Sequence, residues 1–454
     1  MENMTIQRAA ALCGGSIFNN CTDDVTLGKI VIDSRQVVKG DLFAAFRGER
    51  VDGHDYIPAA FDRGAACCLA ERVPAGETRP VILVADVMQA MEDIAAGYRQ
   101  DFDLPIIGIT GSVGKTSAKE MISAVLEQRR FLLKTEGNLN NRYGVPMMLS
   151  RMSSSHQAAV IEMGISEFGE MTHLARMVLP TVAVFTTIGH AHLEFLHDLN
   201  GVLKAKSEML DFLPITAPVI VNGDDPMLAA MTCEQHKITY GFQTECDVRA
   251  ENVKANQKSL TCEIVSGLRR IPVCIPAVGK HYVYAALAAA TVGMLFEMNN
   301  EEICRGIASF KNVERRGELV QNDYLTLIDD SYNANPDSVR SGIDSLMLIQ
   351  APRHICILGD MLELGENAPQ MHYEIGQYAV QQGIDLVLTC GNLSLHTSRG
   401  AGDRGIHYET KSELISALHE QIKPGDSILV KASKGSHFEV ISAELKSFAY
   451  KNEN

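Results

Sequence analysis

A chain of 454 residues is too long for one hydrophobic core and predicts about three domains. Its net charge of −15 is spread along the chain, which argues against nucleic acid as the main partner. The start lacks the features of a signal peptide and no segment is long enough to cross a membrane, so we expect a cytoplasmic protein. The 11 cysteines include no Cys-x-x-Cys pair, which predicts scattered reduced thiols rather than disulfides or zinc sites.

The first predicted unit, residues 1–102, combines short strands and helices in a small α/β domain. Ser34, Arg35 and Arg47 lie beside glycine turns and could bind a phosphate or a sugar. A solvated loop with helix caps is the alternative, and these three residues by themselves favour it. The polar stretch before Pro105 predicts the boundary to the next domain.

Residues 106–117 are the most informative stretch, because an apolar run enters a glycine-rich loop that a helical pattern follows. Gly111 and Gly114 allow backbone N–H groups to face a polyphosphate, Lys115 can reach its β- and γ-phosphates, and the Thr116 hydroxyl can bind Mg²⁺. The strict P-loop template requires glycine where Ile109 stands, so the match is to the shorter Thr-Gly-x-x-Gly-Lys-Thr variant. A plain glycine turn is the alternative, which the Lys-Thr pair in the right frame disfavours. The predicted ATP-binding residues of this loop are Thr110, Gly111, Ser112, Val113, Gly114, Lys115, Thr116 and Ser117.

The second predicted unit, residues 103–312, alternates apolar runs with helical stretches, as a mostly parallel α/β sheet requires. Glu162 ends one buried run, at the sheet edge where ligands of such folds collect. We predict it to be a Mg²⁺ ligand rather than a capped structural acid. A polar turn carries Asn138, Asn140 and Asn141, for which an ordinary loop is an equally good interpretation.

Two histidines, His190 and His192, end the next buried run. A single histidine there would carry little information, whereas a pair at a strand end in a chain with a nucleotide loop favours a functional role. Lys204 and Lys206 follow on a helix, and a pair of solvated lysines is the simpler interpretation of these residues alone.

The third predicted unit, residues 313–454, alternates four apolar strands with helices, which is typical of a Rossmann-like domain. It has no Gly-x-Gly-x-x-Gly opening, so dinucleotide binding is not predicted. Residues 329–336 follow a strand and are dense in amides and carboxylates, which favours recognition of a small polar substrate. The predicted fold class is α/β, with a small N-terminal domain, a central P-loop-type mononucleotide-binding domain and a C-terminal Rossmann-like domain.

Four stretches together resemble the Mur ligase family over nearly the whole chain. They are Asp33-Ser34-Arg35 with the Gly-Asp-Leu-Phe of residues 40–43, the Gly-Asn-Leu-Asn-Asn of residues 137–141, residues 330–336, and the Leu-Gly-Asp-Met-Leu-Glu-Leu-Gly of residues 358–365. The last two are fairly specific to the branch that adds a D-alanyl-D-alanine dipeptide. The Asp-Asn-Pro-Arg signature of the diamino-acid-adding branch does not occur.

The resemblance implies an ATP-dependent ligase of cytoplasmic peptidoglycan precursor synthesis, with UDP-substrate-binding, ATP-binding and Rossmann-like domains. Such an enzyme phosphorylates the carboxylate of UDP-N-acetylmuramoyl-tripeptide, and the amine of D-Ala-D-Ala then attacks the acyl phosphate. We therefore expect small-molecule substrates, two Mg²⁺ sites and a monomer, with no nucleic acid and no membrane insertion. A ligase for another amino acid or peptide, and a non-catalytic nucleotide-binding regulator, stay open as alternatives.

The resemblance also implies catalytic and metal-binding roles. Lys115, His190 and Lys206 would be catalytic, and Lys206 would become a carbamate by reaction with CO₂. Thr116 and Glu162 would hold one Mg²⁺, and His190 and Lys206 would serve the second.

Further roles concern ATP and the two substrates. Arg316 and Asp329 would approach the ATP phosphate and ribose from the C-terminal domain, so the site would be complete only when the domains close. The implied substrate-binding residues, for the UDP end, the peptide and the dipeptide, are Ser34, Arg35, Arg47, Asn138, Asn140, Asn141, Asn333 and Asn335.

Two stretches depart from the family pattern. The family's His-Asn-x-x-Asn-Ala segment, which lines the adenine pocket, stands here as His281-Tyr282-Val283-Tyr284-Ala285, and we interpret the tyrosines as replacements of both asparagines. His281 and Tyr284 are therefore predicted to bind ATP, with Tyr284 stacking on adenine. The family's Lys-Gly-Ser-Arg is written Lys-Ala-Ser-Lys-Gly-Ser at residues 431–436, near the predicted dipeptide end.

Overall fold

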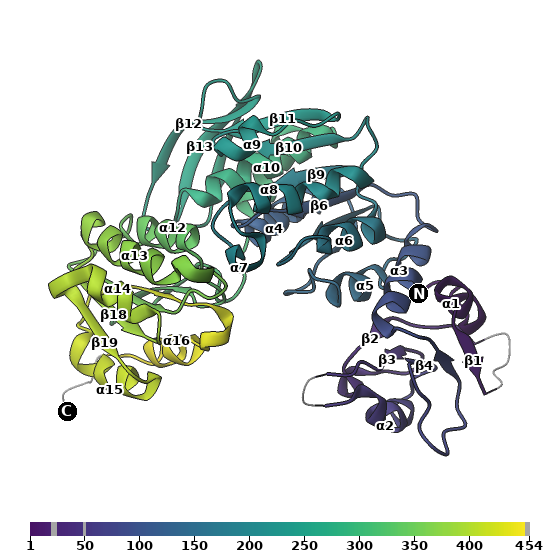
Figure 1. Cartoon of the computed structure of the whole chain (residues 1–454). Helices are drawn as coiled ribbons and strands as arrows, with labels where there is room; N and C mark the ends of the chain where they lie inside the picture. Colours follow the sequence, from purple (N-terminus) through teal and green to yellow (C-terminus); the bar gives the residue numbers. More distant parts are fainter. Residues whose placement is uncertain (20–24, 49–50, 450–454) are drawn as a thin grey trace.

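A computed structural model describes residues 1–19, 25–48 and 51–449, and these form three β-sheets that follow one another along the chain. Figure 1 shows an arch, with the N-terminal and C-terminal sheets at its two ends and the middle sheet between them. The predicted three-domain α/β class is confirmed. The predicted boundaries near residues 102 and 312 fall in segments that connect the sheets.

The N-terminal sheet has the strand order β1-β5-β4-β3-β2, in which β1 pairs antiparallel with β5 and the other neighbours pair in parallel. Apolar side chains of α2 pack on one of its faces, and those of α1 and α3 pack on the other. The elements are α1 (Ile6–Cys13), β1 (Ser16–Phe18), β2 (Ile30–Val31), β3 (Leu42–Ala44), α2 (Ile57–Asp62), β4 (Cys67–Ala70), β5 (Val81–Leu83) and α3 (Val87–Arg99).

The middle sheet has nine strands in the order β14-β13-β12-β11-β10-β9-β6-β8-β7. Strands β6 to β12 pair in parallel, whereas β13 and β14 extend the sheet antiparallel. The strands are β6 (Ile106–Thr110), β7 (Leu132–Lys134), β8 (Ala158–Glu162), β9 (Val182–Phe185), β10 (Pro218–Asn222), β11 (His236–Gly241), β12 (Val248–Ala255), β13 (Leu260–Ser266) and β14 (Arg269–Ile275).

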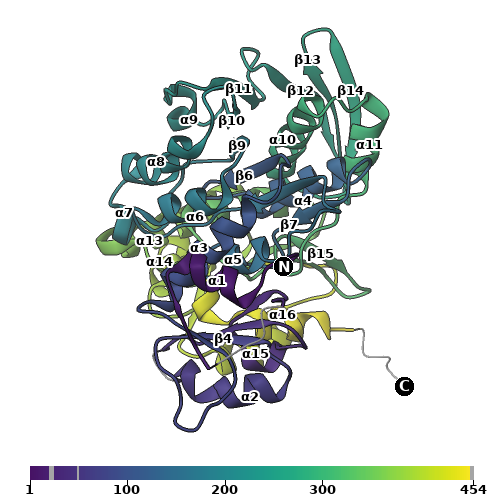
Figure 2. The same cartoon turned by 90° about the vertical axis from the view of Figure 1, so that its right-hand side faces the viewer.

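Helices cover both faces of the parallel part of this sheet, which explains why its strands are continuous apolar runs. Helix α10 is apolar on almost every side because it lies buried against the sheet and α4, on the face opposite α6 (Figure 2). The helices are α4 (Lys115–Leu126), α5 (Gly144–Leu149), α6 (Glu170–Val178), α7 (Leu193–Leu196), α8 (Leu199–Ser207), α9 (Pro226–Ala230), α10 (His281–Leu295) and α11 (Asn300–Ala308).

The C-terminal sheet has the order β15-β16-β20-β17-β18-β19, parallel except for the β15–β16 pair. Hydrophobic clusters lie on both of its faces. The elements are β15 (Glu318–Gln321), β16 (Thr326–Asp330), α12 (Pro336–Leu346), β17 (His354–Gly359), α13 (Ala368–Gln382), β18 (Leu386–Cys390), α14 (Ser394–Ala401), β19 (Gly405–Tyr408), α15 (Lys411–Gln421), β20 (Ser427–Lys431) and α16 (Glu439–Lys446).

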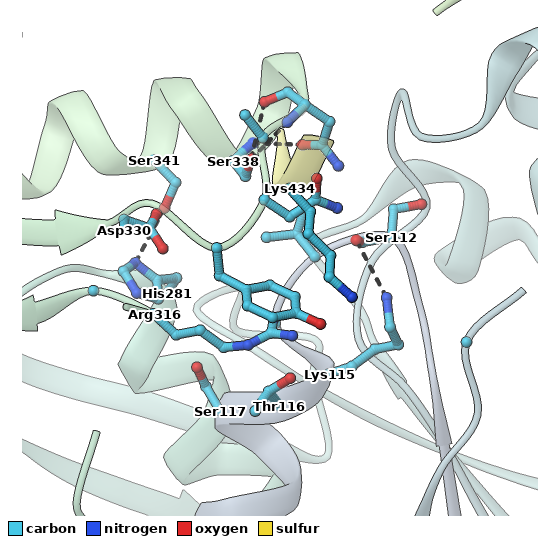
Figure 3. A pocket seen from close by; sticks show the side chains of 18 of the residues that line it. Ser112, Lys115, Thr116, Ser117, His281, Arg316, Asp330, Ser338, Ser341 and Lys434 are labelled. Atoms are coloured by element: carbon cyan, nitrogen blue, oxygen red, sulfur yellow. Dashed lines mark hydrogen bonds between the residues drawn. The ribbon is translucent and has the colours of Figure 1, made fainter. Parts of the chain in front are cut away.

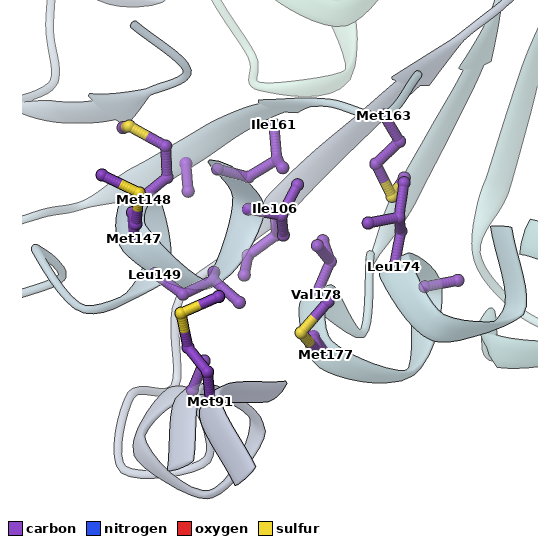
Figure 4. Packing of buried hydrophobic residues seen from close by; sticks show 14 of the residues in the cluster. Met91, Ile106, Met147, Met148, Leu149, Ile161, Met163, Leu174, Met177 and Val178 are labelled. Atoms are coloured by element: carbon purple, nitrogen blue, oxygen red, sulfur yellow. The ribbon is translucent and has the colours of Figure 1, made fainter. Parts of the chain in front are cut away.

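Helix α3 joins the cores of the N-terminal and middle domains. Its buried residue Met91 lies in one continuous hydrophobic cluster with Ile106 of β6, Leu149 of α5 and Val178 of α6 (Figure 4). Arg99 adds polar contacts at the same junction, since its Nε donates to the carbonyl of Val178 at 2.9 Å. The first two domains therefore share one hydrophobic cluster, whereas the sequence predicted a separate core for each.

Two predictions from composition can be compared with the described residues. No helix among them is long and apolar enough to span a membrane. The ten cysteines that the structure describes are free thiols.

Candidate active site between the middle and C-terminal domains

A cavity of about 320 Å³ lies where the glycine loop before α4 faces loops of the C-terminal domain. Figure 3 shows Lys115, Arg316 and Lys434 extending into this space from three different segments. The predicted site residues that line it are Ser112, Val113, Gly114, Lys115, Thr116, Ser117, Asn140, Asn141, Glu162, His281, Arg316, Asn333 and Asn335. Sequence positions more than 200 residues apart thus meet in one cavity.

The glycine loop has the conformation that its sequence requires. Gly111 has φ +144, and a Cβ there would lie 2.0 Å from Oγ1 of Thr186, so no other residue fits. Gly114 has φ +84 and is the N-cap of α4, whose first-turn N–H groups have no partner within the helix and can face an anion. The Lys115 amine donates to the carbonyl of Gly111 at 2.6 Å, and burial lowers its pKa although Glu162 opposes that shift.

Glu162 is buried at the end of β8 with oxygen and amide groups around its carboxylate. The Thr116 hydroxyl donates to Oε2 at 3.1 Å, and Nδ2 of Asn140 donates to Oε1 at 2.8 Å. Carboxylate, hydroxyl and amide oxygens are the donors that Mg²⁺ prefers, so this set fits a magnesium ion. Among the described residues, no three His, Cys, Asp or Glu side chains gather into a metal site.

The C-terminal wall of the cavity contains an ion pair between the buried Lys431 and the half-buried Asp330. The amine of Lys431 donates to Oδ2 of Asp330 at 2.5 Å and to the carbonyl of Asn333 at 2.9 Å. Burial raises the pKa of Asp330, and the nearby Lys431 opposes that rise. Asn335 caps α12, because its Oδ1 accepts the N–H of Ser338 at 2.8 Å. These contacts hold the predicted dipeptide-binding asparagines in place.

Asp329, which we expected near ATP, faces away from the cavity and Asp330 takes its place. Successive residues of a strand point to opposite sides, so only one of the two aspartates at the end of β16 can line the cavity. Asp329 instead accepts hydrogen bonds from Ser331 and Ser442 and lies 2.9 Å from the amine of Lys446. Strand alternation is the sequence signal that distinguishes the two.

Of the two histidines after β9, His192 lines the cavity and His190 does not. The backbone N–H of His190 donates to Oδ2 of Asp337 at 2.6 Å, and its ring also faces that carboxylate. Nδ1 of His192 lies 2.5 Å from Oε2 of Glu363. The choice of His190 is corrected to His192, because the loop turns through a left-handed residue at His192 that strand periodicity does not anticipate.

Lys206 is buried on α8, outside the cavity lining. Burial lowers the pKa of its amine well below the ordinary value; Lys115 lowers it further and Glu170 opposes the shift. The alternative of a solvated lysine is excluded by this position. Lys204, two residues earlier, is exposed and approaches the ring of Phe168.

Several other predicted residues also lie outside this cavity. Arg35 is exposed and forms an ion pair with Asp33 at 2.8 Å, and Arg47 is exposed on the same domain. The predicted site residues absent from its lining are Ser34, Arg35, Arg47, Thr110, Gly111, Asn138, His190, Lys206, Tyr284 and Asp329. Ser34, Arg35 and Arg47 belong to the N-terminal sheet region.

His281 lies at the contact between α10 and α12, where Nδ1 is 3.1 Å from Oγ of Ser341. Burial, with a further contribution from Lys431, lowers its pKa to about 4. The unfolded chain binds a proton near pH 6.5 and the folded chain only near pH 4, so this histidine stabilises the fold above pH 6.5 and loses that effect as the pH falls to 4.

Because of His281, we expect the free energy of unfolding to fall by about 2 kcal/mol between pH 7.5 and 5.0. Urea titrations of the wild type and of His281→Gln at both pH values measure it. The glutamine variant should show the smaller fall, and equal falls in the two proteins would contradict the prediction.

Comparisons with known proteins bear on the same three parts of the chain. The Mur ligase family catalytic domain matches residues 27–99, the Mur ligase middle domain matches residues 109–293, and the Mur ligase glutamate ligase domain matches residues 315–434. A UDP-N-acetylmuramoyl-tripeptide–D-alanyl-D-alanine ligase of Bacillus subtilis (strain 168) is 35% identical over 98% of this chain and 99% of its own length. The chain belongs to the Mur ligase family.

Other relatives agree with this membership. The ligase of the same name from Escherichia coli (strain K12) is 34% identical over 93% of this chain and 94% of its own. A crystal structure of MurF from Acinetobacter baumannii has a TM-score of 0.90 at 28% identity, covering 98% of this chain and 99% of that one. A MurF ligase from Thermotoga maritima, crystallised in complex with ADP, has a TM-score of 0.83 at 26% identity, covering 94% and 98%.

Membership of the Mur ligases also corrects the interpretation of Tyr284. Counted from His281, the second asparagine of the family pattern falls on Ala285, so Tyr282 alone of the two tyrosines replaces an asparagine. Tyr282 lines the cavity, and its hydroxyl donates to the carbonyl of Arg316 at 3.3 Å. The Tyr284 hydroxyl donates to Oδ2 of Asp224 at 2.9 Å, and its ring packs edge-on against Phe242.

We therefore expect Tyr284→Phe to leave the KM for ATP within about twofold of the wild type. Loss of a hydrogen bond to a carboxylate should lower the free energy of unfolding by about 1.5–3 kcal/mol. Steady-state kinetics with varied ATP and urea unfolding check the two parts. If the KM for ATP rises several-fold while the free energy of unfolding is unchanged, Tyr284 contacts the nucleotide and the prediction is wrong.

Proposed function

We propose that this Mur ligase joins D-alanyl-D-alanine to UDP-N-acetylmuramoyl-tripeptide at the expense of ATP, in peptidoglycan precursor synthesis. The observation that carries the proposal is that the glycine loop, Glu162 and the asparagine-rich loop of the C-terminal domain line the same cavity. Relatives whose names state this reaction match nearly the full chain. The same proposal includes domain boundaries at residues 102 and 312, a cytoplasmic location and a monomeric state.

The reaction needs a carboxylate to become an electrophile. Transfer of the γ-phosphoryl group of ATP to the tripeptide carboxylate creates an acyl phosphate and releases ADP, and the dipeptide amine then attacks the carbonyl and displaces phosphate. Lys115 and Arg316 would stabilise the negative charge that develops on the phosphoryl oxygens. Thr116 and Glu162 would hold Mg²⁺, which neutralises phosphate charge when bound.

Opposite walls of the cavity would bind the remaining groups. Asn333 and Lys434 would meet the dipeptide, the lysine as a cation for its carboxylate. The adenine end would lie toward His281 and Tyr282, and Asp330 replaces Asp329 as the nearby acid. Enclosure between two domains would protect the acyl phosphate from hydrolysis.

A second metal site would involve His192 rather than His190, with Lys206 as its partner. A deprotonated amine reacts with CO₂ to give a carbamate and a proton, and the lowered pKa of Lys206 supports this modification. The product would be an anion that can bind Mg²⁺ or orient a ligand of it.

Phosphate release measures the proposed function directly. We expect release with ATP, Mg²⁺, UDP-N-acetylmuramoyl-tripeptide and D-Ala-D-Ala together, and none when any one is omitted. Equal release without the dipeptide, or with another amino acid in its place, would overturn the assignment of the amine substrate. No release with the complete mixture would overturn the ligase itself.

A further inference from the structure

The N-terminal domain places a buried carboxylate against the middle domain. Glu92 of α3 is only 3% exposed, and both of its oxygens are engaged: Nε of Arg142 donates to Oε1 at 2.6 Å, and Nδ1 of His173 lies 2.9 Å from Oε2. An ionised carboxylate is costly to bury without such partners, so this contact holds Arg142 strongly.

Arg142 directly follows the asparagine turn of the active site. Asn140, two residues earlier, donates from Nδ2 to Oε1 of Glu162 at 2.8 Å, and its carbonyl accepts the N–H of Gly164 at 2.8 Å. Asn141 lies between them, and its Oδ1 accepts the N–H of Gly144 at 3.0 Å. The chain from the Glu92 contact to the Glu162 contact is therefore short and hydrogen-bonded throughout.

The same turn has little room to move. A Cβ on Gly144 would lie 2.3 Å from Cα of Leu139, so the turn packs directly on the start of α5. Tyr143 lies edge-on against Phe46 of the N-terminal domain, with ring centroids 5.1 Å apart. A displacement of Arg142 would therefore pass to Asn140 rather than be absorbed by a flexible loop.

We propose that Glu92 is a positioning residue of the ligase: by holding Arg142, it fixes the turn that aims Asn140 at Glu162. The N-terminal domain thereby sets the orientation of the carboxylate that would hold Mg²⁺, although none of its residues that the structure describes lines the cavity. The inference rests on the proposed metal-binding role of Glu162. It assigns to the interface of the first two domains a catalytic consequence and not only a packing role.

The neighbouring residue on α3 supplies a matched control. Oδ1 of Asp93 accepts from the guanidinium of Arg176 on α6 at 2.7 Å, so it crosses the same interface without touching the asparagine turn. Glu92→Gln and Asp93→Asn each remove one negative charge from α3. Only Glu92→Gln weakens the ion pair with Arg142.

The kinetic test compares these two variants with the wild type. Glu92→Gln should lower kcat about tenfold and raise the Mg²⁺ concentration for half-maximal rate at least threefold, with the KM for the UDP substrate within twofold. Asp93→Asn should stay within twofold in all three quantities. Glu92→Gln kinetics that match those of Asp93→Asn, even at a lower melting temperature, would overturn the proposal, because the pair would then be structural only.

A second measurement does not depend on turnover. Mn²⁺ titration in the presence of ADP, followed by electron paramagnetic resonance, should show at least threefold weaker Mn²⁺ binding in Glu92→Gln than in Asp93→Asn. Equal affinities would overturn the positioning role whether or not the wild type proves to be the proposed ligase. If Glu92→Gln does not fold, Arg142→Lys replaces it in this titration. Lysine keeps the positive charge but lacks the Nε donor. Wild-type Mn²⁺ affinity in Arg142→Lys would also overturn the proposal.

Discussion

Replacing Lys115 by alanine is expected to lower kcat by at least a hundredfold, which corresponds to about 3 kcal/mol of lost transition-state stabilisation. The amine lies at the glycine loop, where it donates to the carbonyl of Gly111 at 2.6 Å, so it stands where phosphoryl oxygens would be held. The turn itself is formed by Gly111 and Gly114, which both have positive φ angles. Phosphate release and thermal unfolding of the variant measure the two effects separately.

The melting temperature of Lys115→Ala should change little, because the amine hydrogen bonds only to carbonyls of its own loop in the contacts described. More than about a tenth of the wild-type activity in a folded variant would contradict the role of Lys115. Loss of activity together with loss of the fold would mean that Lys115 has a structural role. Lys115→Met, which keeps most of the apolar stem, would then replace the alanine variant.

The second large effect concerns Lys206. Lys206→Ala is expected to be nearly inactive, with kcat reduced at least a hundredfold, and small carboxylic acids should partly restore it. The physical reason is that the function lost is an anion in a buried space and not a cation, because burial and Lys115 both disfavour the ammonium form. Phosphate release with and without added acetate or formate measures the rescue.

Lys204→Ala is the matched control, since that lysine lies on the same helix but is exposed. It should keep wild-type activity and respond to neither acid. Activity that survives in Lys206→Ala without additive would contradict the carbamate, and a variant restored by alkyl amines but not by acids would identify a cation as the missing group.

The local sequence determined those features of the site that depend only on residues adjacent in the chain. The glycine loop needed Gly111 because a Cβ there would collide with Thr186, and Gly114 because its φ of +84 is a conformation that other residues rarely adopt. Glu162 could be placed at a ligand-binding sheet edge because buried parallel strands read as continuous apolar runs. The asparagines of residues 333 and 335 followed from a polar stretch directly after a strand, whereas the role of those at residues 138–141 came only from the family resemblance.

Tertiary structure decided what depends on the direction of side chains and on distant partners. Asp330 rather than Asp329 faces the cavity through the pleat of β16, and His192 rather than His190 does so through a left-handed turn. No local pattern predicts that Glu92 contacts Arg142 from 50 residues away, or that α3 joins two hydrophobic cores. Periodicity along the chain encodes which face of an element is buried, whereas the partner that covers the face is set only when separate elements pack together.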